Sequence, residues 1–326
     1  MRRWSGTSTG PRLRCSTEAT RLLALAVLIA ACAAGIEPAT QTAAPTTATT
    51  TTTVADPIST TPPPPATPTT VAPPTTTTTD PEVIAPGRAE GSRVTVPEGE
   101  GPFPAVVLVH GGSWVAGSPA SLEPLARHLA GRGFLVVNTA YRLATLKTPS
   151  FPRAAHDVAC AVRHAAHHPA SDGTVALIGH SAGAHLAAVV ALDADRFGDG
   201  CVDSRPARAD LLVGLAGAYD VTALGVLAAP LFGALPSEDP ELWASGNPMH
   251  LASPDDGVRA LLIHGERDTV VPLRFSERFA ARLDEMGLAA AVETLSGVDH
   301  RGVTDPAVIG EIVVSWITGN REQTAS

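Results

Sequence analysis

The sequence predicts an α/β protein whose mostly parallel, doubly wound sheet carries helices on both faces. Short, fully apolar runs rich in β-branched residues recur after residue 94, as expected for buried parallel strands. Amphipathic segments of helical length separate these runs. Glycines stand where two of the helices are expected to end, at Gly131, Gly133 and Gly287. The expected strands are 105–109, 134–138, 175–178, 211–215, 260–263 and 291–295, and the expected helices are 122–130, 154–168, 182–194, 273–286 and 306–317.

The composition excludes two broad classes of protein. The 326 residues have a formal net charge of −9, and no stripe of Lys and Arg follows any segment, so a nucleic-acid partner is not expected. Apolar runs stay well below the roughly 20 residues that a membrane-spanning helix needs, which excludes a multi-pass membrane protein. The hydrophobic fraction of 44% is sufficient for a globular core.

The first 85 residues have the composition of a targeting signal followed by a disordered stalk. Residues 1–36 combine an arginine-rich start with the apolar run 22–31, which is the pattern of an export signal. The run ends in small residues before Cys32, which predicts a lipobox with lipid on that cysteine; a plain cleaved signal peptide is the alternative. Residues 37–85 are rich in Thr and Pro and predict a disordered stalk.

A catalytic domain is then expected over 86–320, with a disordered tail at 321–326. The protein is expected to be exported, either anchored at the cell surface as a lipoprotein or secreted. Its only membrane contact would be the lipid anchor, and its oligomeric state is not indicated.

A nucleophile motif follows one of the expected strands. Gly179-His-Ser-Ala-Gly183 lies between the strand 175–178 and the apolar helix that begins at Ala182. G-x-S-x-G in a strand–turn–helix context forms a sharp turn that exposes the serine hydroxyl. Ser181 is therefore the candidate nucleophile, and the alternative is a tight turn with an incidental serine.

A serine nucleophile needs a base and an acid that orients the base. Asp268 and His300 follow the last two expected strands, in the chain order Ser, Asp, His. Asp268 would hold the His300 ring, and His300 would take the Ser181 proton. Asp220 and Asp299 are alternative acids, whereas His185 lies one helical turn beyond Ser181 and is expected to be a buried structural histidine.

His110-Gly-Gly-Ser-Trp114 follows the strand 105–109 and predicts an oxyanion hole. Its glycines allow backbone N–H groups to face a developing oxyanion. The expected donors are Gly112, Ser113 and Ala182, with His110 and Gly111 supporting the loop. Trp114 is either a wall of the acyl pocket or a packing anchor.

Cys15 and Cys32 lie in the leader. The other two of the four cysteines, Cys160 and Cys201, predict one disulfide in an exported protein, with two separate buried thiols as the alternative. No Cys/His cluster has the spacing of zinc ligands, so neither a metal nor a cofactor is expected.

Taken together, these motifs resemble the α/β-hydrolase superfamily over about residues 90–318. They are similar to an esterase branch that includes hormone-sensitive-lipase-like esterases, bacterial feruloyl-esterase-like domains and kynurenine formamidase. H-G-G-x-W at 110–114 fits the feruloyl-esterase and formamidase form, whereas the lipase-like loop has three glycines. The motifs that carry the resemblance also include Tyr141-Arg-Leu143, Gly179–His185, Tyr219-Asp220 and His264–Asp268.

The resemblance implies an α/β-hydrolase fold and a serine hydrolase that cleaves small carboxylic esters through an acyl-enzyme. An amidase or peptidase on the same triad, and a catalytically silent surface-binding module, are the rival interpretations. About 44 residues separate the strands 211–215 and 260–263, which allows at most a small lid around 224–235.

Overall fold

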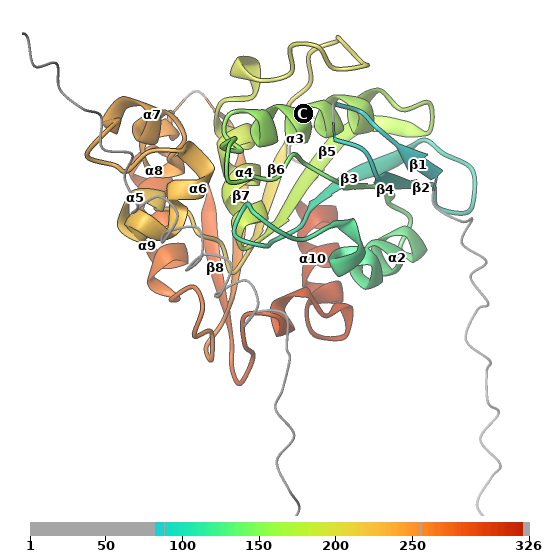
Figure 1. Ribbon diagram of the computed structural model, residues 1–326. Helices are drawn as coiled ribbons and strands as arrows, with labels where there is room; N and C mark the ends of the chain where they lie inside the picture. The colour runs from blue at the N-terminus through green and yellow to red at the C-terminus, as the bar shows by residue number, and fades with distance from the viewer. Residues whose placement is uncertain (1–81, 88, 255, 322–326) are drawn as a thin grey trace, which may run out of the picture.

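The computed structural model describes residues 82–87, 89–254 and 256–321 (Figure 1). The expected leader with Cys32, the stalk up to residue 81 and the tail from residue 322 lie outside these residues. Within the described part, no helix has both the length and the apolar character needed to span a membrane.

The described residues form an eight-stranded sheet in the order β1-β2-β4-β3-β5-β6-β7-β8. Strands β3 to β8 are parallel to one another, while β2 pairs antiparallel with both β1 and β4. The predicted mostly parallel sheet is therefore confirmed. The strands are β1 (Glu82–Ile84), β2 (Ser92–Thr95), β3 (Phe103–Val109), β4 (Leu135–Thr139), β5 (Ser171–His180), β6 (Leu211–Leu215), β7 (Arg259–Gly265) and β8 (Ala290–Leu295).

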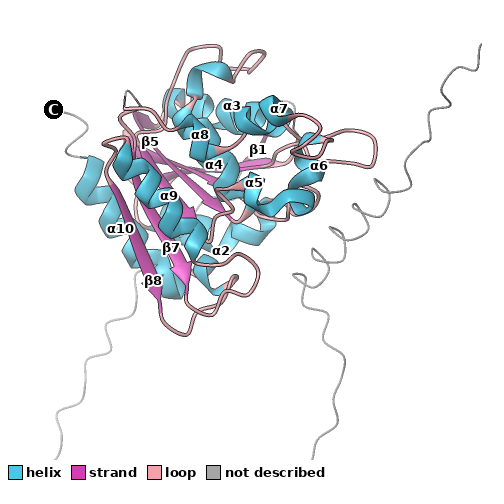
Figure 2. Ribbon diagram, turned by 90° about the vertical axis from the view of Figure 1, so that its left-hand side faces the viewer, coloured by secondary structure: helices cyan, strands magenta, loops and turns pink. Residues whose placement is uncertain are grey.

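Helices cover both faces of the sheet, as predicted (Figure 1). α3 (Arg153–His167), α4 (Ala182–Leu192) and α9 (Arg274–Glu285) pack on one face, and α2 (Glu123–Gly131) and α10 (Pro306–Arg321) pack on the other. Figure 2 shows α9 and α10 on opposite sides of β7 and β8. Because each central strand is buried on two sides, successive residues such as Val107 and Leu108 enter different core clusters. This explains why the strands read as continuous apolar runs.

Two strands at the N-terminal edge were not predicted. β1 lies inside the segment assigned to the stalk, so the folded domain begins before residue 86. At the other end, α10 includes Arg321, which was assigned to the tail. β1 and β2 are short and partly polar, and their pairing partners define them more than their own pattern does.

Residues 216–258, here called the cap, connect β6 to β7 and form short helices in place of a long lid. The cap helices are α5 (Val221–Leu224), α6 (Ala229–Phe232), α7 (Pro240–Ser245) and α8 (Pro248–Leu251), with a 3₁₀ turn at Gly225–Ala228. In Figure 1 they cluster beside α4 and α9.

A disulfide joins Cys160 on α3 to Cys201 in the loop before β6, and the two Cα atoms are 5.2 Å apart. Next to this disulfide, residues 86 and 87, which follow β1, pack closely against α3 and the loop that contains Cys201. The Val202 amide donates to the Pro86 carbonyl at 3.2 Å. A Cβ atom at Gly87 would lie 2.9 Å from Asp157 Oδ1 and 3.3 Å from Cys160 Cβ.

Candidate active site

Ser181 occupies a strained turn between β5 and α4. Its backbone has φ 54° and ψ −118°, a conformation that L-residues rarely adopt. The turn is possible because its flanking glycines leave room for neighbouring backbone. A Cβ atom at Gly179 would lie 2.3 Å from the Gly183 carbonyl oxygen, and one at Gly183 would lie 2.2 Å from the Val109 oxygen. The sequence motif therefore encodes a close crossing of β3, β5 and α4 at the serine.

Asp268 and His300 are hydrogen-bonded to each other at the ends of β7 and β8. His300 Nδ1 donates to Asp268 Oδ2 at 2.7 Å, and the two side chains are 10% and 1% exposed. Since Nδ1 carries the proton in this bond, Nε2 of a neutral His300 has a free lone pair that can accept one. This is the arrangement that a general base requires.

Both oxygens of the Asp268 carboxylate accept hydrogen bonds. Oδ1 accepts from the amides of Val270 and Val271 at 2.8 and 2.9 Å. Oδ2 lies 3.2 Å from His264 Nε2, whose N–H is shared with the Val271 carbonyl at 2.8 Å. Burial acts to raise the pKa of Asp268, but the hydrogen bonds from His264, His300 and Val271 outweigh burial and hold the pKa below its usual range. The carboxylate therefore stays charged beside His300.

The two alternative acids have other partners. Asp220 accepts from the Ala223 amide at 3.2 Å as the N-cap of α5 and pairs with Arg278 at 3.3 Å. Asp299 accepts from the amides of Arg301 and Gly302 at 3.1 and 2.8 Å. Asp220 also accepts from the Asn247 side chain at 3.3 Å, so it links α5 to other parts of the domain, whereas the Asp299 bonds lie within its own loop.

The loop 110–114 turns sharply next to Ser181. Gly112, Ser113 and Trp114 have φ of 124°, 52° and 63°, and the Gly112 carbonyl accepts from the amides of Val115 and Ala116, three and four residues later. A Cβ atom at Gly111 would lie 3.1 Å from Ser181 Cβ, so the loop approaches the serine closely.

His110 braces this loop from inside. Its Nδ1 donates to the Gly111 carbonyl at 2.8 Å, and its ring stacks on Tyr141 with centroids 4.3 Å apart. The Tyr141 hydroxyl in turn donates to the His110 carbonyl at 3.0 Å. Burial lowers the pKa of His110 to about 4, so the ring is neutral at pH 7.

A pocket of about 60 Å³ brings several of the predicted residues together. Ser181, Ala182, Ser113 and Trp114 all line it. The other lining side chains are apolar and come from the cap and from the segment after Asp268: Ala218, Leu224, Leu227, Val270 and Val271. Gly112 and His300 are not among the lining residues.

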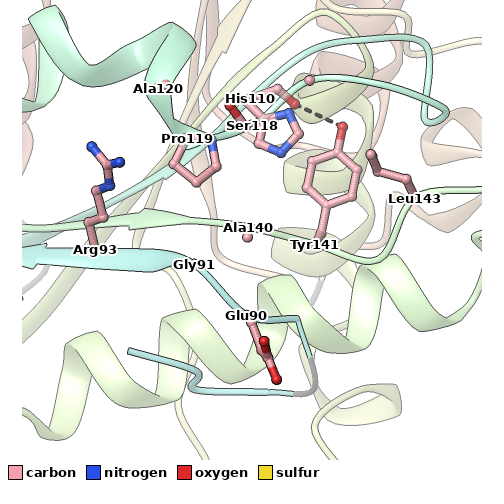
Figure 3. A pocket seen from close by; sticks show the side chains of 11 residues that line it. Glu90, Gly91, Arg93, His110, Ser118, Pro119, Ala120, Ala140, Tyr141 and Leu143 are labelled. Carbon is pink, nitrogen blue, oxygen red and sulfur yellow. Dashed lines mark hydrogen bonds between the residues drawn. The ribbon is translucent and has the colours of Figure 1, made fainter. Parts of the chain in front are cut away.

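A second cavity of about 280 Å³ is lined by His110 (Figure 3). Arg93, Ser118, His110 and Tyr141 line it together with Glu90, and Ser181 does not. Its size alone does not make it the reaction site, because the candidate nucleophile faces the smaller pocket.

Three further histidines contact the site residues, and the sequence analysis assigned a role to one of them, His185. His264 holds Asp268, as described above, and its Nδ1 accepts from the Ser276 hydroxyl at 2.8 Å. His180 Nε2 donates to the His300 carbonyl at 2.9 Å, with the two rings 4.8 Å apart. His185 is buried, as expected, and bonds to Trp114. Their only sequence signal is their position inside the motifs.

Across residues 82–87, 89–254 and 256–321, no group of three or more His, Cys, Asp or Glu side chains is placed to hold a metal ion.

The sheet, the strained serine and the Asp–His pair together define an α/β-hydrolase fold with the side chains of a serine hydrolase. The family model BD-FAE matches residues 94–283, more than half of the chain, and the chain belongs to this family. The match confirms the resemblance to an α/β-hydrolase esterase branch.

The chain resembles individual relatives in sequence and solved structures in fold. The chain is 28% identical over 199 residues to Esterase LipC of Mycobacterium tuberculosis, a match that covers 56% of this chain and 48% of LipC. It thus spans about half the length of that relative. A truncated carbohydrate esterase from gut microbiota superposes with a TM-score of 0.66 at 21% identity, over 78% of this chain and 99% of that one. Esterase Est2 of Thermogutta terrifontis gives 0.61 at 21% identity, over 73% and 92%.

Proposed function

We propose that this protein is an exported serine hydrolase that cleaves carboxylic esters through an acyl-enzyme. The observation that carries the proposal is the Asp268–His300 hydrogen bond beside the strained turn of Ser181. Membership of the BD-FAE family and the relatives named as esterases support an ester substrate.

In the proposed reaction, His300 Nε2 takes the hydroxyl proton as Ser181 Oγ attacks the ester carbonyl. The negative charge that develops on the carbonyl oxygen is stabilised by the backbone N–H groups of Gly112, Ser113 and Ala182. His300 then gives the proton to the leaving alkoxide, and the alcohol departs. A water molecule, deprotonated by the same histidine, attacks the acyl-enzyme carbonyl. As the bond to Ser181 Oγ breaks, His300 returns that proton to Oγ, and the acid is released.

The pocket composition supports an uncharged acyl group. Apart from two serines, its lining side chains are apolar, and none of them is charged. An anionic acyl group would lose its hydration there without gaining a partner.

Ser181→Ala tests the proposal directly. The wild-type protein should hydrolyse p-nitrophenyl acetate and react with a fluorophosphonate probe, and the variant should do neither while keeping its unfolding midpoint. Labelling without ester turnover, but with turnover of p-nitroanilides, would favour an amidase. Absence of both reactions in the wild type would favour a silent binding module.

Export and lipid attachment at Cys32 form a separate part of the proposal. The signal-like leader and the Thr/Pro-rich segment support it, together with the disulfide, which is typical of oxidising compartments. The full-length protein should partition into the detergent phase, and Cys32→Ala should move it to the aqueous phase. Equal partition of both proteins would favour a plain cleaved signal.

A further inference from the structure

A hydrogen-bonded chain connects the pocket wall to the cap through α4. Trp114 Nε1 donates to His185 Nδ1 at 3.2 Å, and His185 Nε2 bonds to the Gly246 carbonyl at 2.7 Å. The indole and imidazole rings also meet edge to face, with centroids 5.3 Å apart. One side chain of α4 therefore contacts both the loop beside Ser181 and the cap.

The two bonds fix the tautomer of His185. An indole nitrogen can only donate, so Nδ1 must be the acceptor. The carbonyl of Gly246 can only accept, so Nε2 must carry the proton. Burial lowers the pKa of His185 to about 4, which keeps the ring neutral in this tautomer. Both ends of the chain are then satisfied at neutral pH.

The anchoring matters because the Trp114 backbone is not in a relaxed conformation. Its φ of 63° is a left-handed value that a bulky residue rarely adopts, so contacts elsewhere must hold it. The Ala144 amide holds its carbonyl at 2.8 Å, and His185 holds its ring.

The other end of the chain is packed firmly in the cap. A Cβ atom at Gly246 would lie 2.6 Å from the Phe232 ring, and Phe232 packs on Trp243 with ring centroids 4.4 Å apart. The Gly246 carbonyl is therefore a fixed reference point for His185.

We propose that His185 is a specificity-determining positioning residue, which fixes the Trp114 indole against the cap and so limits the length of acyl chain that the Ser181 pocket accepts. This inference rests on the proposed esterase function. It follows from the position of Trp114 in the wall of a pocket of about 60 Å³, where a small displacement of the indole changes a large part of the volume.

The test measures kcat/KM for p-nitrophenyl esters from acetate to octanoate. Trp114→Phe removes the indole donor and His185→Leu removes its acceptor. Each should raise the octanoate-to-acetate ratio by roughly tenfold, the upper range for one hydrogen bond. The double variant should show the same ratio as either single variant, because both single substitutions remove the same hydrogen bond. His185→Asn, whose Oδ1 stands near the Nδ1 position, should restore most of the wild-type ratio. His167→Leu on the surface of α3 is the matched control and should leave the ratio unchanged.

An unchanged ratio in folded His185→Leu, or additive effects in the double variant, would overturn the inference and leave His185 a purely structural residue. If His185→Leu does not fold, the single variants Trp114→Phe and His185→Asn decide, because the inference requires a raised ratio in the first and a nearly wild-type ratio in the second. A wild-type protein that turns over no ester and resists the fluorophosphonate probe refutes the proposed function instead, so the two failures are distinguishable.

Discussion

Asp268→Asn should abolish nearly all activity by forcing the wrong tautomer on His300. The new amide must place its NH₂ group at one of the two former oxygen positions. At Oδ1 it would face the amides of Val270 and Val271, which can only donate. At Oδ2 it faces His264 and His300, of which His300 can move its proton from Nδ1 to Nε2. His300 then has no lone pair for the Ser181 proton.

The magnitude follows from the contacts. The same substitution in other triads lowers kcat by about 10⁴-fold, which corresponds to roughly 5.5 kcal/mol in the barrier. His264 Nε2–H still has the Val271 carbonyl at 2.8 Å as an acceptor, so the donor left unpaired is the second hydrogen of the new amide, and the free energy of unfolding should fall by roughly 1–3 kcal/mol.

The assay is kcat/KM for p-nitrophenyl acetate together with urea unfolding. Asp220→Asn is the matched control, because that carboxylate caps α5 and pairs with Arg278. The reasoning is refuted if Asp268→Asn keeps more than about a tenth of the wild-type rate, or if Asp220→Asn is the more damaging change.

Three further outcomes are expected. Gly183→Ala should prevent folding or activity, because the new Cβ would lie 2.2 Å from the Val109 oxygen. Gly131→Ala in α2 is the control and should be neutral or stabilising, because no atom lies within 4 Å of the position of its Cβ. Thermal unfolding compares the two variants. Burial holds the pKa of His110 and His185 near 4, below the unfolded value of about 6.5, so their contribution to stability is full above pH 6.5 and lost as pH falls toward 4. His185→Leu should reduce the slope of unfolding free energy against pH near pH 5 by about 1.4 kcal/mol per unit, and an unchanged slope contradicts this. Reduction of the disulfide, which closes a 41-residue separation, should remove about 4 kcal/mol and lower the unfolding temperature by roughly 8–16 °C, while esterase rates at 25 °C remain unchanged; equal melting with and without reductant would be the contrary result.

The central sheet was predictable because its strands are buried on both faces. Residues 106–109 can be recognised as a buried strand from their own sequence, because every position is apolar. The placement of Ser181 followed equally from local pattern, because only glycine fits where Gly183 meets β3.

The edge strands and the histidine contacts depend on pairing across the chain. β1 has three residues, and nothing in their sequence indicates that Glu82 pairs with Val94 and Ile84 with Ser92. Likewise, the bonds of His185 to Trp114 and Gly246 join positions 71 and 61 residues apart. Sequence periodicity shows that His185 is on a buried helix face, but the identity of its partners requires the folded chain.

The close packing of residues 86 and 87 has a mechanical consequence. A pull on residue 82 would first separate β1 from β2, because only three residue pairs join the two strands. The next resistance is the chain packed between α3 and the loop closed by Cys160 and Cys201. Load applied at the start of the domain therefore passes into a covalent cross-link and a surface helix before it reaches the strands that carry Ser181, Asp268 and His300.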